Sequence, residues 1–430
     1  MSEKGIDRAQ NITIVTLLLT AVLLFTSLPL FGDLSDRSLL ELAREHFRRE
    51  ETSVGSGTSD VAHLALPVRM VYTNDYARLG AGMLTTLSDE FERAGTYLGE
   101  ALGSANNPVP ISELVFLSAL RGEGLYFDFT STLPSEVLFN LLGVTAAKSE
   151  TETVRRVLLA PAGENDAVLY VQDGAGAHIR FSTAVSSADL MDFLASQSGV
   201  SASFAYLLGA SYAQLSPYTI VLNDTESHNA LSASNVLSAG EETFLRRAGF
   251  NAHAENRFTE SSGTVIVREA TSMLYLRPDG TVDYQGSEAA RGTIYYVPAA
   301  EPGAPTPAEA AAAAQTLVAT LMQDFLGSAS LYLSSVERGE ESYEICFDLM
   351  VDGIPVRFAD GSHAASVIIT DQHVAAFSLK ARRYAQTDTA AQLLPFSLSS
   401  AVAATWNRAE LIVAYVDAGG DRVDPAWIAE

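Results

Sequence analysis

The chain has 430 residues, about three times the ~150 of an average domain, so two or three domains are expected. It is 47% hydrophobic and 18% charged, which excludes disorder as its main state. Its 52 acidic and 27 basic residues give a net charge of -25, which argues against a nucleic-acid partner and against binding to anionic lipid headgroups. The single cysteine, Cys346, excludes an intrachain disulfide and a zinc site with several cysteines.

A transmembrane helix is the first predicted element. Residues 9–32 carry no charge, and about 20 apolar residues suffice to cross the hydrocarbon core of a bilayer. A cleaved signal peptide is the alternative, but the segment ends without a clear small-residue cleavage site. We therefore expect a short cytoplasmic leader (1–8), one membrane helix (9–32) and a single-pass protein of the cell membrane whose C-terminal domains are extracellular. Basic residues on both sides of the helix make the orientation signal weak.

One face of this helix carries hydroxyl side chains. At about 100° per residue they fall within a ~60° stripe on an otherwise aliphatic helix. Helices in lipid associate through small residues and hydroxyl hydrogen bonds, so the stripe is a candidate contact with another membrane helix. The alternative is that each hydroxyl binds a carbonyl of its own helix. The residues are Thr13, Thr16, Thr20 and Ser27.

The part after the helix reads as an α+β ectodomain of helices packed on antiparallel sheets. Residues 33–59 are expected to form a stalk helix and a linker rich in Ser, Gly and Thr. An N-terminal α+β domain is predicted over 60–165, with strands at 66–72 and 125–129 and a helix over 84–102.

A middle α+β domain is predicted over 166–297 and a C-terminal one over 308–430, separated by a Pro- and Ala-rich linker at 298–307. Asp-Gly pairs at 173–174, 279–280 and 352–353 separate alternating segments, which indicates β-hairpins. The C-terminal domain should open with a helix over 307–326, in which Leu317, Leu321 and Phe325 share one face. A second helix is expected over 397–408 and a last strand over 410–416.

No motif for catalysis, cofactor binding or metal binding stands out. The seven histidines are too far apart for a zinc helix, although His363 and His373 could meet across a hairpin. Asp417, Asp421 and Asp424 surround two glycines and could bind calcium, but this pattern is also ordinary turn chemistry. Cys346 lies within an apolar strand without a basic sequence neighbour, which favours a buried structural thiol. We therefore predict a protein that is not an enzyme and has no cofactor.

Several short segments, in order and at matching spacing, resemble YycH-type regulators of Gram-positive bacteria. The N-terminal segments are EALGSA (100–105), IS (111–112), YFDF (126–129) and LP (133–134). The middle and C-terminal segments are LSASN (231–235), GFN (249–251), NRFTE (256–260), LRPDG (276–280), AYV (414–416), GG (419–420) and PAW (425–427).

The resemblance implies a function that composition does not reveal. Proteins of this type, which are similar to YycI in topology, restrain the WalK (YycG) sensor histidine kinase of a two-component system that controls cell-wall metabolism. The expected partners are therefore a membrane sensor histidine kinase and a YycI-like companion, and no catalytic residues come with the resemblance. The alternative function is a binding or inhibitor module that acts on a protease or a cell-wall hydrolase.

Overall fold

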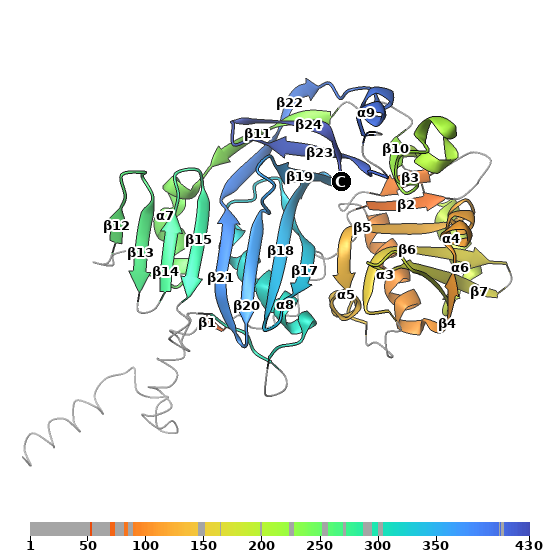
Figure 1. The fold of residues 1–430 in the computed structure, drawn as a ribbon, viewed down its shortest axis with the longest axis horizontal. Helices are drawn as coiled ribbons and strands as arrows, with labels where there is room; N and C mark the ends of the chain where they lie inside the picture. The colour runs from red at the N-terminus through yellow and green to blue at the C-terminus, as the bar shows by residue number, and fades with distance from the viewer. Residues whose placement is uncertain are drawn as a thin grey trace, which may run out of the picture. The chain divides into compact units, whose positions relative to one another are not determined.

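The computed structural model describes residues 52–53, 69–73, 81–84, 89–144, 151–163, 165–197, 200–222, 228–251, 257–269, 272–286, 295–299, 304–403, 405 and 408–430. From Ser53 onward these residues belong to one compact unit, Ser53–Glu430 (Figure 1). None of the helices described is both long and apolar enough to cross a membrane. The predicted membrane segment, with Thr13, Thr16, Thr20 and Ser27, lies outside the described residues, so it stays a prediction.

The first of two sheets is antiparallel and contains the strands from β2 to β10. Its spatial order is β10-β9-β3-β2-β5-β6-β7-β8-β4. The bounds are β2 (Arg69–Thr73), β3 (Ala81–Leu84), β4 (Asn106–Ile111), β5 (Gly124–Pro134), β6 (Thr153–Ala162), β7 (Asn165–Gln172), β8 (His178–Ser186), β9 (Val200–Phe204) and β10 (Ile220–Leu222).

Helices cover both faces of this sheet. On one face lie α3 (Asp89–Ser104), α5 (Ser135–Leu141) and α6 (Ser187–Ala195), and their buried residues pack on those of β5 to β8. On the other face α4 (Glu113–Leu120) buries Phe116 and Leu120 against Val71, Tyr126 and Leu158. The predicted helix over 84–102 thus begins later, at Asp89, because Leu84 is the last residue of β3.

The second sheet is longer and contains the remaining large strands. Its main order is β12-β13-β14-β15-β21-β20-β18-β19-β23-β24-β11-β22, with β17 paired to β18 and β16 to β21. The bounds are β11 (His228–Asn235), β12 (Arg257–Thr259), β13 (Val265–Glu269), β14 (Ser272–Leu276), β15 (Thr281–Gly286), β16 (Tyr295–Tyr296), β17 (Ser330–Arg338), β18 (Ser342–Val351), β19 (Ile354–Phe358), β20 (Ala365–Thr370), β21 (His373–Lys380), β22 (Arg382–Ala391), β23 (Leu411–Asp417) and β24 (Arg422–Ala429).

Helix α8 (Pro307–Met322) covers one face of this sheet, together with α7 (Leu237–Arg247), as Figure 1 shows. Thr306 and Glu309 form a capping box and Pro307 occupies the first turn, which accounts for the sharp start of α8. Leu317 and Leu321 are buried as predicted. Phe325 lies beyond the helix end and stacks on Phe244 of α7, with ring centroids 5.7 Å apart.

The Asp-Gly pairs predicted to form hairpins do so. They connect β7 to β8, β14 to β15 and β18 to β19. At the last of these both Asp352 and Gly353 have positive φ, 50° and 77°, which suits the twist of a two-residue hairpin turn. The strands of the predicted middle and C-terminal domains meet in one sheet, since β15 pairs with β21. The domain boundaries expected at 165/166 and 297–308 stay predictions.

One end of the second sheet is built by pairings between segments that are distant in the sequence. Strand β11 pairs with β22 and β24, and β19 pairs in parallel with β23. Helix α9 (Phe396–Ala403) lies between β22 and β23 in sequence and contacts Trp427 of β24 through Phe396. These pairings bring the C-terminal strands next to the first sheet, and the candidate site begins there.

Candidate functional site

The residues singled out for catalysis or metal binding do not converge on one place. His373 contacts Tyr296, whereas His363 binds Asp348, so the two do not meet. Asp417 is buried and its carboxylate accepts hydrogen bonds from Arg382 and Tyr384, while Asp424 pairs with Arg422. In the part of the chain that the structure describes, no group of three or more His, Cys, Asp or Glu residues is arranged to hold a metal ion.

Cys346 is a free, buried thiol in β18, as the sequence predicts. The sequence did not reveal that His363, which follows β19, lies beside it. Asp348 accepts a hydrogen bond from Nδ1 of His363 at 3.1 Å, and Arg357 of β19 also contacts Asp348. Burial alone would raise the pKa of Asp348, but the hydrogen bond from His363 and the charge of Arg357 lower it.

His363 is expected to stay protonated at neutral pH. Its hydrogen bonds with Asp348 and Cys346 raise its pKa to about 10. Because this folded-state pKa lies above the ~6.5 of an unfolded chain, the stabilisation is complete below pH ~6.5 and is lost as the pH rises through about 10. In an NMR titration the His363 ring should show the imidazolium shift up to pH ~9. Asp348→Asn should bring the titration back toward neutral pH, and an unshifted midpoint in the wild type would refute this assignment.

A buried cluster of charged side chains joins the two sheets. Arg69 of β2 and Arg155 of β6 contact Asp128 of β5 within the first sheet. Glu410, the residue before β23, reaches across from the second sheet and pairs with Arg69 and Arg156. The side chain of Asp128 is fully buried, and those of Arg69 and Glu410 are 9% and 8% exposed. The ion pairs of this cluster therefore connect the two sheets and are largely shielded from solvent.

The pKa values of this cluster favour the charged pairs. Burial alone would lower the pKa of Arg69, but the carboxylates of Asp128 and Glu410 more than offset it, and the pKa is raised. Arg156 also donates to Gln172 at 2.7 Å and lies over the ring of Tyr218, 4.5 Å from its centroid. The cluster thus continues along β6 and β7 to a second junction of the two sheets.

That second junction lies at the start of α4. Arg408, just before β23, pairs with Glu113, whose pKa is lowered mainly by the hydrogen bond from Arg408. The hydroxyl of Tyr218 donates to Glu113 at 3.3 Å and lies 3.0 Å from Nε2 of His178. Burial lowers the pKa of His178, which favours its neutral form. Both residues that anchor the second sheet here, Arg408 and Glu410, belong to one short stretch of chain.

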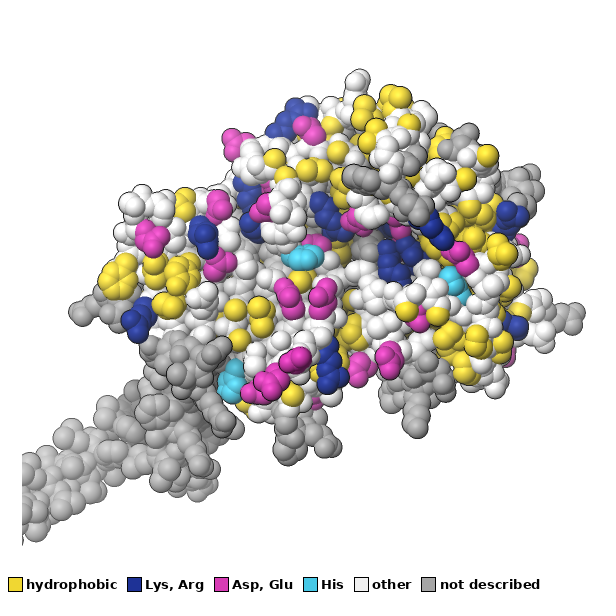
Figure 2. Space-filling model, viewed as in Figure 1, with side chains coloured by type: hydrophobic (Ala, Val, Ile, Leu, Met, Phe, Trp, Pro, Cys, Tyr) yellow, Lys and Arg dark blue, Asp and Glu magenta, His cyan; other side chains and the backbone are white. Residues whose placement is uncertain are grey.

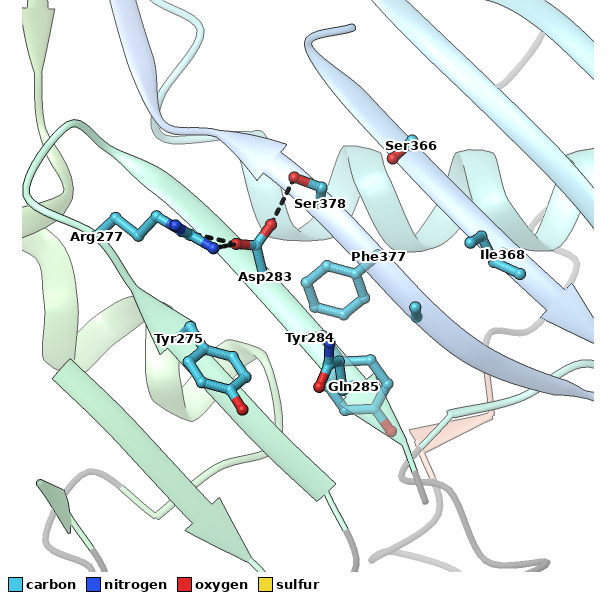
Figure 3. Close-up of a pocket in the computed structure, with 10 residues that line it drawn as sticks. Tyr275, Arg277, Asp283, Tyr284, Gln285, Ser366, Ile368, Phe377 and Ser378 are labelled. Atoms are coloured by element: carbon cyan, nitrogen blue, oxygen red, sulfur yellow. Dashed lines mark hydrogen bonds and ion pairs between the residues drawn. The ribbon is translucent and has the colours of Figure 1, made fainter. Parts of the chain in front are cut away.

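A shallow groove of about 370 Å³ lies on the face of the second sheet opposite α8 (Figure 3). It crosses four neighbouring strands, β14, β15, β21 and β20, and has a floor of small side chains that includes Ser366, Ala376 and Ser378. Tyr275 borders one end and the half-exposed Ile368 the other. Asp283 accepts hydrogen bonds from Arg277 and Ser378 on one side of the groove.

A second groove, of about 460 Å³, lies near the ends of β19, β21 and β23. Four of the charged side chains that line it pair with one another, since Lys380 contacts Asp360 and Arg382 contacts Asp417. Asp279 accepts a hydrogen bond from the N–H of Thr281. This leaves less free hydrogen-bonding capacity for a ligand than the first groove has.

Exposed apolar side chains gather over α4 and α9 (Figure 2). Leu394, just before α9, and Leu398 and Val402 on α9 are spaced four residues apart and are 57–69% exposed. Seven of the ten large hydrophobic side chains exposed in the described residues lie on these helices and the segments beside them, and we call these seven the apolar flank. They are Val109, Leu114, Val115, Leu208, Leu394, Leu398 and Val402.

Contacts connect the parts of the apolar flank. Tyr212, shortly after Leu208, packs on Phe396 of α9 with ring centroids 5.4 Å apart, and Arg408 pairs with Glu113 at the start of α4. The sequence from 389 to 407 has no charged residue, although the chain as a whole carries -25. The flank is therefore an apolar, nearly neutral surface on a strongly acidic protein, which is typical of a protein contact.

Comparison with known proteins gives one informative likeness. No protein-family model matches the chain, and no curated protein is similar to it in sequence. The crystal structure of YycH from Bacillus subtilis is similar to it with a TM-score of 0.57, over 86% of this chain and 95% of that one. The chain has a YycH-type fold. At 12% sequence identity the likeness to YycH shows the fold alone.

The YycH-type fold is the fold that the resemblance of the short sequence segments implies, and it confirms the predicted α+β class. Of those segments, YFDF (126–129) lies within β5 and contains Asp128 of the buried cluster. The sequence did not predict the cluster itself, because its members come from positions 69, 128, 155, 156 and 410. The one signal in the sequence that could have indicated buried charge is the pair Arg155-Arg156, which precedes the apolar run of β6.

Proposed function

We propose that this chain is a membrane-anchored regulatory protein that modulates a sensor histidine kinase of a two-component system controlling cell-wall metabolism. The observation that carries the proposal is the YycH-type fold, which extends over most of the chain. The protein acts by contact rather than by catalysis, with the kinase and a YycI-like companion as partners. Hydrolysis of peptidoglycan or peptides by the purified chain would contradict the non-enzymatic part of this proposal.

The apolar flank is the surface that we propose for the kinase contact. Interfaces draw most of their binding energy from a few central apolar or aromatic side chains that exclude water. The flank offers such side chains on α9, and the stretch 389–407 around them carries no charged residue. An apolar patch on the extracellular part of the kinase would therefore meet little unpaired charge here.

Replacing Leu398 and Val402 together by glutamate should weaken association with the kinase more than tenfold, because two buried carboxylates would be left without partners in the complex. Co-purification of the two full-length proteins from membranes measures this. The matched control replaces Met191 and Phe258, which are exposed outside the flank, by glutamate. Equal recovery of kinase by both double variants would show that the flank is not the contact, and no recovery by the wild type would argue against the regulatory function itself.

The membrane helix supplies a second proposed contact. Replacing Thr13, Thr16, Thr20 and Ser27 together by leucine should reduce pairing with the kinase in a membrane two-hybrid assay, by a modest factor because each hydroxyl bond contributes only ~0.6 kcal/mol. Changing Leu18, Ala21 and Thr26 to isoleucine, on other faces of the helix, is the control. If both sets leave pairing unchanged, the hydroxyl stripe is not an interface.

A further inference from the structure

The groove of Figure 3 requires recognition by side chains alone. Its four strands lie inside the sheet, in the order β14-β15-β21-β20, and β13 and β18 continue the sheet on either side. Their backbone N–H and C=O groups are therefore used in pairing with neighbouring strands. A peptide adds to a sheet through free backbone groups at an edge. At this groove a peptide would have to bury its own backbone groups without partners, which is costly.

The polar side chains of the groove are divided into fixed and free groups. Asp283 is held in place by Arg277, whose Nε donates to it at 2.8 Å, and by the hydroxyl of Ser378, also at 2.8 Å. Gln285 and Ser366 have no hydrogen-bond partner for their side chains among the residues that the structure describes. The hydroxyl of Tyr275 has only a weak contact, 3.6 Å long, with the sulfur of Met273. The groove thus presents an oriented acceptor together with an amide and two hydroxyls that can both donate and accept.

The charge of the groove selects a neutral ligand. Among the described residues that line it, Arg277 and Asp283 are the charged ones, and they pair with each other. The field of a chain with a net charge of -25 disfavours an anionic ligand. An apolar ligand would leave the side chains of Gln285 and Ser366 desolvated without compensation.

A saccharide fits a groove that offers side chains alone, has free hydrogen-bonding groups and carries no net charge in its lining. Its hydroxyls pair with side-chain acceptors and donors, and the carbon-bound hydrogens on one face of the sugar ring can pack on Tyr275 or Ile368. Strands ~4.8 Å apart make a groove across four of them roughly 14 Å long, which accommodates a short oligosaccharide. The small side chains of Ser366, Ala376 and Ser378 leave the middle open for it (Figure 3). We propose that this groove binds a neutral oligosaccharide, a property that goes beyond the proposed function and does not depend on it.

The test uses the full-length chain in detergent with chitotriose, cellotriose and an uncharged Gly-Ser peptide as probes, followed by saturation-transfer NMR and calorimetry. At least one trisaccharide should bind with a dissociation constant of about 1 mM or tighter, and the peptide should not bind. Gln285→Ala and Tyr275→Ala should each weaken binding several-fold. Gln285 is exposed and has no partner to lose, so Gln285→Ala tests the groove without affecting the fold.

Ala376→Trp fills the groove from its floor and should abolish binding. Ala385→Trp, on the exposed outer strand β22, is the matched control and should bind like the wild type. The proposal is overturned if neither trisaccharide binds at 10 mM probe, if the peptide binds and the sugars do not, or if Ala376→Trp and Gln285→Ala bind as tightly as the wild type.

Discussion

Replacing Glu410 with alanine should lower the free energy of unfolding by about 3–5 kcal/mol, the usual cost of removing one partner from a buried ion pair. Glu410 is the residue through which the second sheet enters the buried cluster, where it pairs with Arg69 and Arg156. Without it these guanidinium groups share Asp128, which also contacts Arg155. Among the described members of the cluster, three arginines would then face one carboxylate instead of two.

Urea unfolding followed by circular dichroism measures the decrease in the free energy of unfolding. Glu344→Ala is the matched control because Glu344 is exposed on β18. The control should change the free energy of unfolding by less than ~0.5 kcal/mol. A double-mutant cycle adds Arg69→Met, which removes one of the three guanidinium charges that pair with Glu410. The double variant should be more stable than the sum of the single effects predicts, with a coupling energy above ~1 kcal/mol. Additive effects would mean that the Arg69–Glu410 contact contributes little.

Local signals in the sequence were sufficient to predict most of the hairpins and helices. The Asp-Gly pairs at 279–280 and 352–353 require positive φ at their turns, and the strands beside them alternate or are continuously apolar. The start of α8 could be read from Thr306, Pro307 and Glu309. In these places propensity, turn chemistry and apolar periodicity agree, so the local sequence is enough.

Strands with polar sequences were not predicted. Strand β11 reads HNALSASN and β22 reads RRYAQTDTAA, and neither has the apolar alternation of a half-buried strand. Strand β24 contains Pro425, which argues against a strand in the middle of a sheet. These segments become strands because they pair with one another across long stretches of chain, β11 with β22 and with β24. Such pairing is a tertiary effect that no local pattern encodes.

The buried clusters were missed for the same reason. Asp348 and Cys346 share one face of β18, but His363 reaches them only because its loop returns along the sheet after β19. The absence of a basic residue next to Cys346 in sequence therefore said nothing about its neighbours in space. The groove was missed because Tyr275, Asp283, Ser378 and Ser366 become one surface only when β14, β15, β21 and β20 lie side by side.

Replacing Gly327 with alanine should cost about 4 kcal/mol of stability, from strained backbone together with a steric clash. Gly327 follows α8 and has a φ of 65°, in the left-handed region that side chains disfavour. A Cβ placed there would lie 2.2 Å from the carbonyl oxygen of Tyr384. That oxygen accepts the hydrogen bond of Ser328 N–H at 2.8 Å, so β22 cannot move away without breaking the tie between the end of α8 and the sheet.

The variant Gly176→Ala separates the contribution of backbone strain from that of the steric clash. Gly176 lies in the β7–β8 turn with a φ of 84°, but no atom lies within 4 Å of the position that a Cβ would take. Gly176→Ala should therefore lose only the ~1–2 kcal/mol of the backbone strain. Because backbone strain is common to both variants, the difference in their unfolding free energies, measured in urea, reports the clash with Tyr384. If Gly327→Ala is no less stable than Gly176→Ala, β22 is not held against the end of α8 as tightly as this contact requires.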